Sequence, residues 1–371
     1  MGAFPFRILE PGGRLAVETN WKKKSFFYGY FSLTVLYCVL HFTTLVYCLV
    51  FKKGYFLSPN FTVHALLSIG WSYAAFGALS LYILWPDTTV QIFNTLFSEQ
   101  YRSPQTSKSW KEYSLQEIIG ITAPIPFFYM SISLVSLTHF LNSDRLYSVL
   151  AIYPVDIAES PVMYVFVSVI DIILFVFPES ACYFTIVFQL LIFMLIDGLL
   201  GKHNHLLRAH KSLDGARAEH VIEEHIQSCQ RVELLIQLFN HNFMFVIFSL
   251  KSFIITFSIL LWYSAILFHE TEPFVSAVYA LMGIDLNLMF VVLYDHAFGV
   301  TVKMFELKQR ITEKCSGIKC QRKRKLALLK IKSIPNFGIK IGNFQVFQQT
   351  STTILVDFVL KNLAGLVVAT M

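Results

Sequence analysis

Seven long apolar runs constrain the fold of this chain more than any other feature. A helix needs about 20 apolar residues to cross a hydrocarbon core of about 30 Å. The runs occupy residues 26–51, 62–85, 117–141, 161–200, 242–268, 274–298 and 343–371. Each has the length of a membrane-spanning helix. We therefore expect an all-α, polytopic membrane protein with seven transmembrane helices.

The composition supports this class and excludes others. Of the 371 residues, 55% are hydrophobic and only 15% are charged, whereas soluble domains carry about 25% charged residues. These values exclude a disordered chain, a collagen-like fibre and a small disulfide scaffold. The net charge of +6 is gathered in a few polar segments. We interpret it through membrane orientation and expect no nucleic-acid partner.

The basic residues set the orientation. The run 161–200 contains Pro178, so it is either one kinked helix or two helices. If it is one helix, a single side of the membrane carries 25 Lys and Arg, in segments 1–25, 86–116, 201–241 and 300–342. The other side then carries three, namely Lys52, Lys53 and Arg145. Because Lys and Arg accumulate in the cytoplasm, the N-terminus is expected to be cytosolic and the C-terminus extracellular. G-protein-coupled receptors have the opposite orientation.

Two of the cytosolic segments are expected to be structured. Apolar residues recur at helical spacing in 201–241, so it is predicted to extend the fourth and fifth helices into the cytosol. The basic segment 300–342 has a similar pattern. Together they predict a helical anchor bundle, and its remaining apolar faces favour subunit contacts. The domains are thus a tail at 1–25, six transmembrane helices at 26–299, the anchor segment at 300–342 and the last helix at 343–371.

The sequence carries no enzyme, cofactor or metal signature. It has no Gly-rich phosphate loop, no His-Glu-x-x-His and no Gly-x-Ser-x-Gly. Cys315 and Cys320 are too far apart for a zinc knuckle. We expect no catalysis, cofactor or metal. Asn60 begins the sequon Asn-Phe-Thr in the predicted outer loop, so it is a candidate glycosylation site. The run 322–325 fits contact with anionic membrane lipid or the ordinary positive-inside bias.

A polar stripe follows the predicted last helix. It comprises Gln345, Gln349, Thr353, Asp357 and Lys361, spaced at i+4. Such a row drifts about 40° per step, so a tilted helix keeps much of it turned to one axis. Ionisable groups within a span usually face water or a bundle interior. The stripe therefore predicts a pore lining. The alternative is that Asp357 and Lys361 neutralise each other in a packed interface.

This organisation resembles the insect gustatory and odorant receptor superfamily. Gustatory receptors end with Thr-Tyr, five residues and Gln-Phe, and Thr350 and Phe358 match that frame. In a second frame, residues 342–344 match the Gly-x-Phe that precedes the motif. The stretch 153–164 is similar to the loop before the fourth span of odorant receptors. The chain is thus most like a divergent gustatory receptor.

The resemblance implies a ligand-gated, non-selective cation channel in the plasma membrane. Four subunits, identical or related, would join through the anchor bundle, and each would give its last helix to a central pore. A pocket for a small organic tastant would open outward among the second to sixth spans. Aromatic residues in the outer halves of these spans are Trp71, His139, Tyr164, Trp262 and Tyr279. The alternatives are an odorant receptor subunit of the same superfamily and a secondary transporter with intramembrane Asp and Lys.

Overall fold

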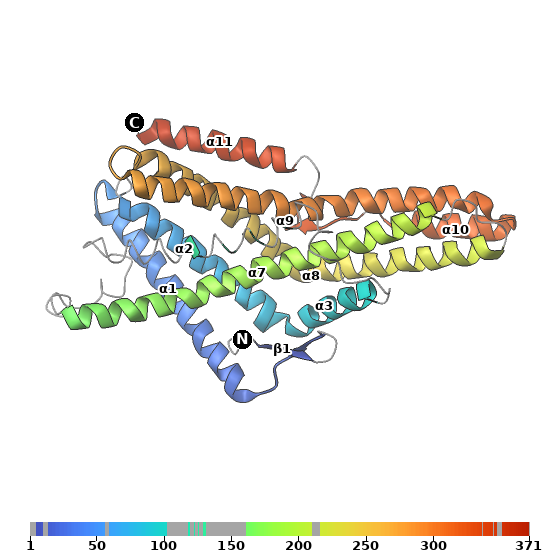
Figure 1. Ribbon diagram of the computed structural model, residues 1–371, viewed down its shortest axis with the longest axis horizontal. Helices are drawn as coiled ribbons and strands as arrows, with labels where there is room; N and C mark the ends of the chain where they lie inside the picture. The colour runs from blue at the N-terminus through green and yellow to red at the C-terminus, as the bar shows by residue number, and fades with distance from the viewer. Residues whose placement is uncertain are drawn as a thin grey trace.

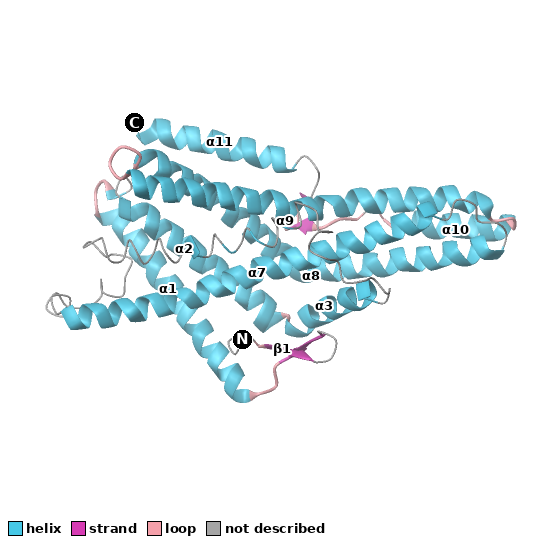
Figure 2. Ribbon diagram, viewed as in Figure 1, coloured by secondary structure: helices cyan, strands magenta, loops and turns pink. Residues whose placement is uncertain are grey.

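The architecture is taken from a computed structural model of the chain. It describes residues 5–9, 14–55, 59–101, 161–209, 216–335, 337–343, 345–346 and 351–370, and the isolated positions 118, 122, 125, 129 and 130. Nearly everything drawn in Figure 2 is helix, and the strands form short hairpins. The predicted helical class is therefore confirmed. The predicted third span, 117–141, lies outside the described residues apart from the isolated positions.

The N-terminal segment, predicted only as a tail, begins with a hairpin. Strands β1 (Phe6–Leu9) and β2 (Arg14–Val17) pair antiparallel. Helix α1 (Trp21–Phe51) follows, and the side chain of its N-cap residue Asn20 accepts a hydrogen bond from the amide of Lys22. A short polar side chain at this position satisfies one of the free amides of the first turn.

Three helical elements follow α1. Helix α2 (Pro59–Ala78) passes into a π-helical turn, η2 (Leu79–Leu84), and α3 (Pro86–Tyr101) follows at once. Helix α3 occupies the first half of the segment that the sequence predicted as a loop. Asn94 of α3 ties it to the hairpin, because its side chain accepts from the amide of Leu15 and donates to the carbonyl of Leu15, both at 2.8 Å. The side-chain amide of Asn94 thus makes the two hydrogen bonds that a neighbouring strand would make with Leu15.

The three longest helices form the body of the molecule. They are α7 (Pro161–Ala209), α8 (Ala216–Leu267) and α9 (Pro273–Lys314). Helix α7 is continuous through Pro178, so the segment forms one helix in place of two. The end of α7 and the start of α8 lie within 201–241, where helical spacing was predicted, and residues 210–215 are outside the described residues. In Figure 1 these helices extend to the right, well beyond α1, α2 and α11.

The C-terminal part packs on this body. After a 3₁₀ turn, η5 (Cys315–Gly317), helix α10 (Gln321–Ser333) lies beside the far ends of α8 and α9. Strands β3 (Lys340–Ile341) and β4 (Gln345–Val346) form a second hairpin, and α11 (Ser351–Thr370) packs against α8. In Figure 1 the C-terminus lies at the opposite end of the molecule from α10.

Five of the described helices are long and apolar enough to cross a membrane. They comprise Trp21–Phe51, Phe61–Leu84, Ser180–Arg208, Glu219–Leu267 and Pro273–Gly317. These match the first, second, fourth, fifth and sixth predicted spans, and α11 corresponds to the predicted last one. One large hydrophobic core runs along α2, α7, α8 and α9. The count of seven spans and the orientation stay predictions.

Candidate functional site

Helix α11 carries the part of the polar stripe that the structure describes. It begins at Ser351, so Gln345 precedes it and lies in β4, while Gln349 is outside the described residues. Thr353 is exposed. Further along the helix, Lys361 Nζ lies 2.7 Å from Asp357 Oδ2. The stripe on the helix is thus shorter than predicted, and its two ionisable members form an ion pair.

This ion pair is exposed in the middle of an apolar helix. The side chains of Lys361 and Asp357 are 74% and 59% exposed, and they occupy the second and third turns of a 20-residue helix. Ionisable groups in hydrocarbon are costly and usually face water or a protein partner. If α11 spans a bilayer, the face that carries this pair must turn toward water or toward another chain.

The apolar residues of α11 are equally uncovered. Ile354, Phe358 and Leu360 are 50–64% exposed, and among the described α11 side chains Val359 is the buried one. Among the side chains described, α11 thus leaves most of its apolar surface exposed at the edge of the bundle. Lipid can cover its apolar surface, but lipid does not solvate the Asp357–Lys361 pair.

The aromatic residues that were predicted to line a ligand pocket lie in different contacts between helices. Trp71 of α2 is buried and stacks on Tyr37 of α1, with ring centroids 4.8 Å apart. Trp262 of α8 packs against α9, where a Cβ on Gly283 would meet its ring at 3.2 Å. Tyr279, one turn before Gly283 on α9, is buried beside Phe268, with centroids 6.2 Å apart.

Two members of the predicted pocket are not described. His139 lies outside the described residues, and Tyr164 lies in α7 with a side chain that is not described. Trp262 and Tyr279 thus share the α8–α9 contact, while Trp71 belongs to the contact between α1 and α2. A single pocket that unites the set stays a prediction. Asn60, the candidate glycosylation site, lies in the first turn of α2.

A buried polar cluster between α2, α7 and α9 was missed by sequence reasoning. Tyr73 of α2 and Gln189 of α7 lie close together, and both are at least 97% buried. Tyr294 of α9 is fully buried nearby, in contact with Phe193 and Phe290. Buried polar groups of this kind fix helix register or contact a ligand. Their only signal in the sequence is a Gln inside an apolar run.

A second charged centre joins α7 to α9 at the end of the fourth predicted span. Asp197 Oδ1 lies 2.7 Å from Lys303 Nζ, and Asp197 Oδ2 lies 3.2 Å from His296 Nδ1. Asn204 donates to the carbonyl of Lys303 at 2.9 Å. Gly299 leaves room for the carboxylate, since a Cβ there would come within 2.9 Å of Asp197 Oδ1. These contacts fix the helices where they leave the predicted membrane segment.

Ion pairs and hydrogen bonds also join the segments of the predicted anchor bundle. Lys330 and Lys323 of α10 lie 2.6 and 2.7 Å from Glu223 and Glu219 of α8. The side chain of Asn240 donates to the carbonyl of Gly338 and accepts from the amide of Lys340. Within the described part of the chain, no group of three or more His, Cys, Asp or Glu residues is placed to hold a metal ion.

The fold is similar to that of an insect olfactory receptor. Insect olfactory receptor OR5 from Machilis hrabei is 12% identical, with a TM-score of 0.64 over 98% of this chain and 94% of that chain. The structure of OR5 in complex with eugenol gives a TM-score of 0.72 at 11% identity, over 99% and 94%. No protein-family model and no curated protein matches the chain. The predicted resemblance to the insect chemoreceptor superfamily is thereby confirmed at the level of the fold.

Proposed function

We propose that the protein is a chemoreceptor subunit that forms a ligand-gated, non-selective cation channel in the plasma membrane. The observation that carries this proposal is the exposed ion pair of Asp357 and Lys361 on α11, on the edge of an olfactory-receptor fold. Four copies of α11 around a common axis would place this pair in water. The exposed apolar side chains of α11 would then contact neighbouring subunits and lipid.

The anchor segments support assembly of several chains. Leu326 and Leu329 of α10 and Phe305 of α9 are 54–57% exposed, in the region where cytosolic contacts are predicted. Exposed apolar residues grouped on one region mark interaction surfaces. A homotetramer, or a heterotetramer with related subunits, would cover them.

The proposed ligand is a small organic tastant. Its pocket would be lined by the aromatic residues of the outer halves, among which Trp262 and Tyr279 already lie on one helix contact. Thr350 and Phe358 favour the gustatory branch. An odorant receptor subunit is the second candidate, favoured by the likeness to a receptor whose structure holds eugenol.

Whole-cell recording tests the channel directly. Cells that express the protein are challenged with a panel of small organic compounds, beginning with eugenol and sugars, and reversal potentials are measured under bi-ionic conditions. If Asp357 lines the pore, Asp357→Asn should reduce cation permeability and Lys361→Gln should increase conductance. Robust current with unchanged reversal potentials in both variants removes this pair from the pore.

Epitope tags test the orientation on which the pore depends. An N-terminal tag should be stained only after permeabilisation, and a C-terminal tag should be stained on intact cells. Surface staining of the N-terminal tag would overturn the orientation and, with it, the cytosolic position of the anchor bundle.

A further inference from the structure

The N-terminal hairpin has one packed face and one exposed face. Its register pairs Leu9 with Arg14, and alternation along β1 places Arg7 on the same face as these two. All three side chains are exposed. Phe6, on the opposite face, meets Tyr82 of η2 with ring centroids 5.4 Å apart. The exposed face therefore combines two cations with one apolar side chain.

The junction between the hairpin and α1 is held in one geometry. The buried carboxylate of Glu18 accepts hydrogen bonds from the amides of Thr19 and Asn20, both at 3.0 Å. Its second oxygen lies 3.3 Å from Lys23 Nζ. The amide of Glu18 donates to the carbonyl of Pro5 at 2.7 Å. The first turn of α1 thus has a fixed position relative to the hairpin.

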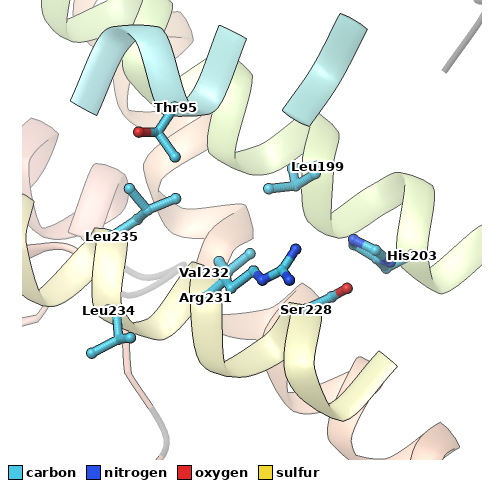
Figure 3. A pocket seen from close by; sticks show the side chains of 8 residues that line it. All are labelled: Thr95, Leu199, His203, Ser228, Arg231, Val232, Leu234 and Leu235. Carbon is cyan, nitrogen blue, oxygen red and sulfur yellow. The ribbon is translucent and has the colours of Figure 1, made fainter. Parts of the chain in front are cut away.

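Helix α3 connects the hairpin to the bundle. Asn94 bonds to the backbone of Leu15, and the next residue, Thr95, borders a cavity of about 170 Å³ between α3, α7 and α8. Figure 3 shows Leu199 of α7 and Leu235 of α8 on other sides of this cavity. Because α3 contacts the hairpin as well as α7 and α8, the exposed face of the hairpin is presented in a defined orientation.

The hairpin lies level with the predicted cytosolic ends of the first two spans. Phe27 of α1 meets Tyr82 of η2, with ring centroids 5.9 Å apart, and Phe6 contacts the same tyrosine. Trp21 precedes Phe27 by six residues, about 9 Å along the helix, and Trp85 follows Tyr82 by three. These two tryptophans are 75% and 40% exposed. Exposed tryptophans at the ends of spans are typical of the head-group level of a bilayer.

The charge at this level is strongly positive. Segments 5–9 and 14–24 together contain five Lys and Arg and one acidic residue, Glu18, which is buried and paired with Lys23. The lysines at 22–24 lie in the first turn of α1, which contains no acidic residue. Cations are unfavourable at the N-terminal end of a helix dipole. Helix stability therefore does not account for them, whereas attraction to an anionic membrane surface does.

We propose that the surface formed by Arg7, Leu9, Arg14, Trp21 and Lys22 docks on the anionic lipid surface of the cytosolic leaflet. The three cations would lie against the head groups, and the indole and Leu9 would enter the interface. In Figure 1 the hairpin and the start of α1 lie at the edge of the molecule opposite α11. The surface would thus meet lipid at the rim, away from the axis proposed for α11. The choice of leaflet rests on the predicted orientation and not on channel activity.

Hydrogen–deuterium exchange of the full-length protein in lipid nanodiscs tests the docking. The nanodiscs contain phosphatidylcholine alone or phosphatidylcholine with phosphatidylserine, and a third sample adds soluble glycerophosphoserine to the neutral nanodiscs. We expect amide exchange in 14–24 to be at least about fivefold slower with phosphatidylserine, the factor that one basic group gains near an anionic surface. Soluble glycerophosphoserine should leave the exchange unchanged.

A triple variant removes the exposed cations of the surface. It combines Arg7→Gln, Arg14→Gln and Lys22→Gln and keeps the pair of Glu18 and Lys23. The slowing by phosphatidylserine should be lost. Exchange in neutral nanodiscs should match that of the wild type, which shows that the hairpin is still folded.

The matched control combines Arg322→Gln, Arg324→Gln and Lys325→Gln. It removes the same charges from exposed positions of α10, so the slowing in 14–24 should persist. An equal loss in this control would mean a general effect of net charge and would overturn the surface. Equal exchange of the wild type in both nanodiscs, or undiminished slowing in the first triple variant, would overturn it as well.

The remaining outcomes concern the source of the anion. Equal slowing by glycerophosphoserine in neutral nanodiscs would assign the surface to a soluble anion and would overturn the membrane as its partner. Both leaflets of a nanodisc contain the same lipids, and no current is recorded. Each outcome is therefore distinct from the tests of orientation and of the channel.

Discussion

Helices α9 and α11 both match predicted transmembrane spans, yet they are covered very differently. On α9, Leu286 and Phe290 are fully buried against the bundle, while Leu281, Ile284 and Leu288 on another face are 46–56% exposed. On α11, exposed residues surround the single buried Val359, among the side chains described. Helix α9 thus has one face packed against the bundle and one exposed apolar face, whereas the described part of α11 exposes a polar pair as well as apolar side chains.

The ionisable groups show the same difference. Asp197 is 88% buried in its side chain and contacts both Lys303 and His296. Asp357 has Lys361 on its own helix, and both are mostly exposed. Breaking a buried pair leaves a charge without solvent and costs several kcal/mol, while exposed pairs contribute about 0–1 kcal/mol. One pair therefore serves the stability of the subunit, and the other is available for a role outside it.

The largest effect is expected in the packed region. Phe290→Ala should lower the free energy of unfolding by about 3 kcal/mol, because the cavity it leaves loses contacts on every side. Leu288→Ala, on the exposed face of the same helix, should change it by no more than about 0.5 kcal/mol. Thermal denaturation in detergent, followed by size-exclusion chromatography, measures both. Similar losses in the two variants would show that the exposed face of α9 is covered by protein.

A smaller effect is expected where α7 and α9 meet. In Gly299→Ala the added methyl would come within 2.9 Å of Asp197 Oδ1, so the carboxylate must move away from Lys303. We expect a loss of about 2 kcal/mol. In an Asp197→Ala background the same glycine substitution should cost much less, since the clash is absent. Additive losses in this double-mutant cycle, measured by the same assay, would contradict the contact.

A substitution on the exposed face of α10 tests whether subunits associate through this face. Leu329→Lys places a charge at a position that is 56% exposed, so the monomer should be nearly as stable as before. If the face is a subunit contact, association should weaken at least tenfold, because the interface would bury an unpaired charge. Mass photometry of the detergent-extracted protein measures this, with Lys332→Gln on the same helix as the control. Intact oligomers in Leu329→Lys would remove this face from the interface.

The sequence identified the helices well and their ends poorly. Long apolar runs predicted α1, α7, α8 and α9, because the requirement to cross a bilayer leaves a strong signal in composition. The start of α11 was placed at 343 instead of 351. Gly342 explains the difference: it adopts a φ of 57°, its amide bonds to the carbonyl of Met244, and it turns β3 into β4. Such a turn depends on α8, nearly 100 residues earlier.

The contacts that unite distant segments were also beyond sequence reasoning. Nothing in the local pattern indicates that Asn94 completes the hairpin at Leu15 or that Asp197 meets His296 and Lys303. Each side chain is ordinary for its surroundings, and the information lies in the packing of α3, α7 and α9. The i+4 relation of Asp357 and Lys361, in contrast, is local, and their ion pair follows directly from helical geometry.

The smallest effect on stability and the sharpest on function are expected from exchanging the two charges of α11. In the double variant with Asp357→Lys and Lys361→Asp, the ion pair is kept in reverse order, so stability should change by less than about 0.5 kcal/mol. The carboxylate, however, moves one turn, about 6 Å, toward the C-terminus.

If α11 lines a pore, that displacement moves the ring of negative charge outward along the permeation path. The bi-ionic reversal potential should then shift at unchanged surface expression, because cations would meet the carboxylates before the ammonium groups. A pair that only neutralises itself within a packed interface is insensitive to its order. In that case the exchanged variant would give wild-type reversal potentials, although each single substitution would strand a charge and reduce the amount of protein at the surface. The exchange thus distinguishes a role of the ion pair in permeation from a role in packing, which a measurement of stability at these positions does not do.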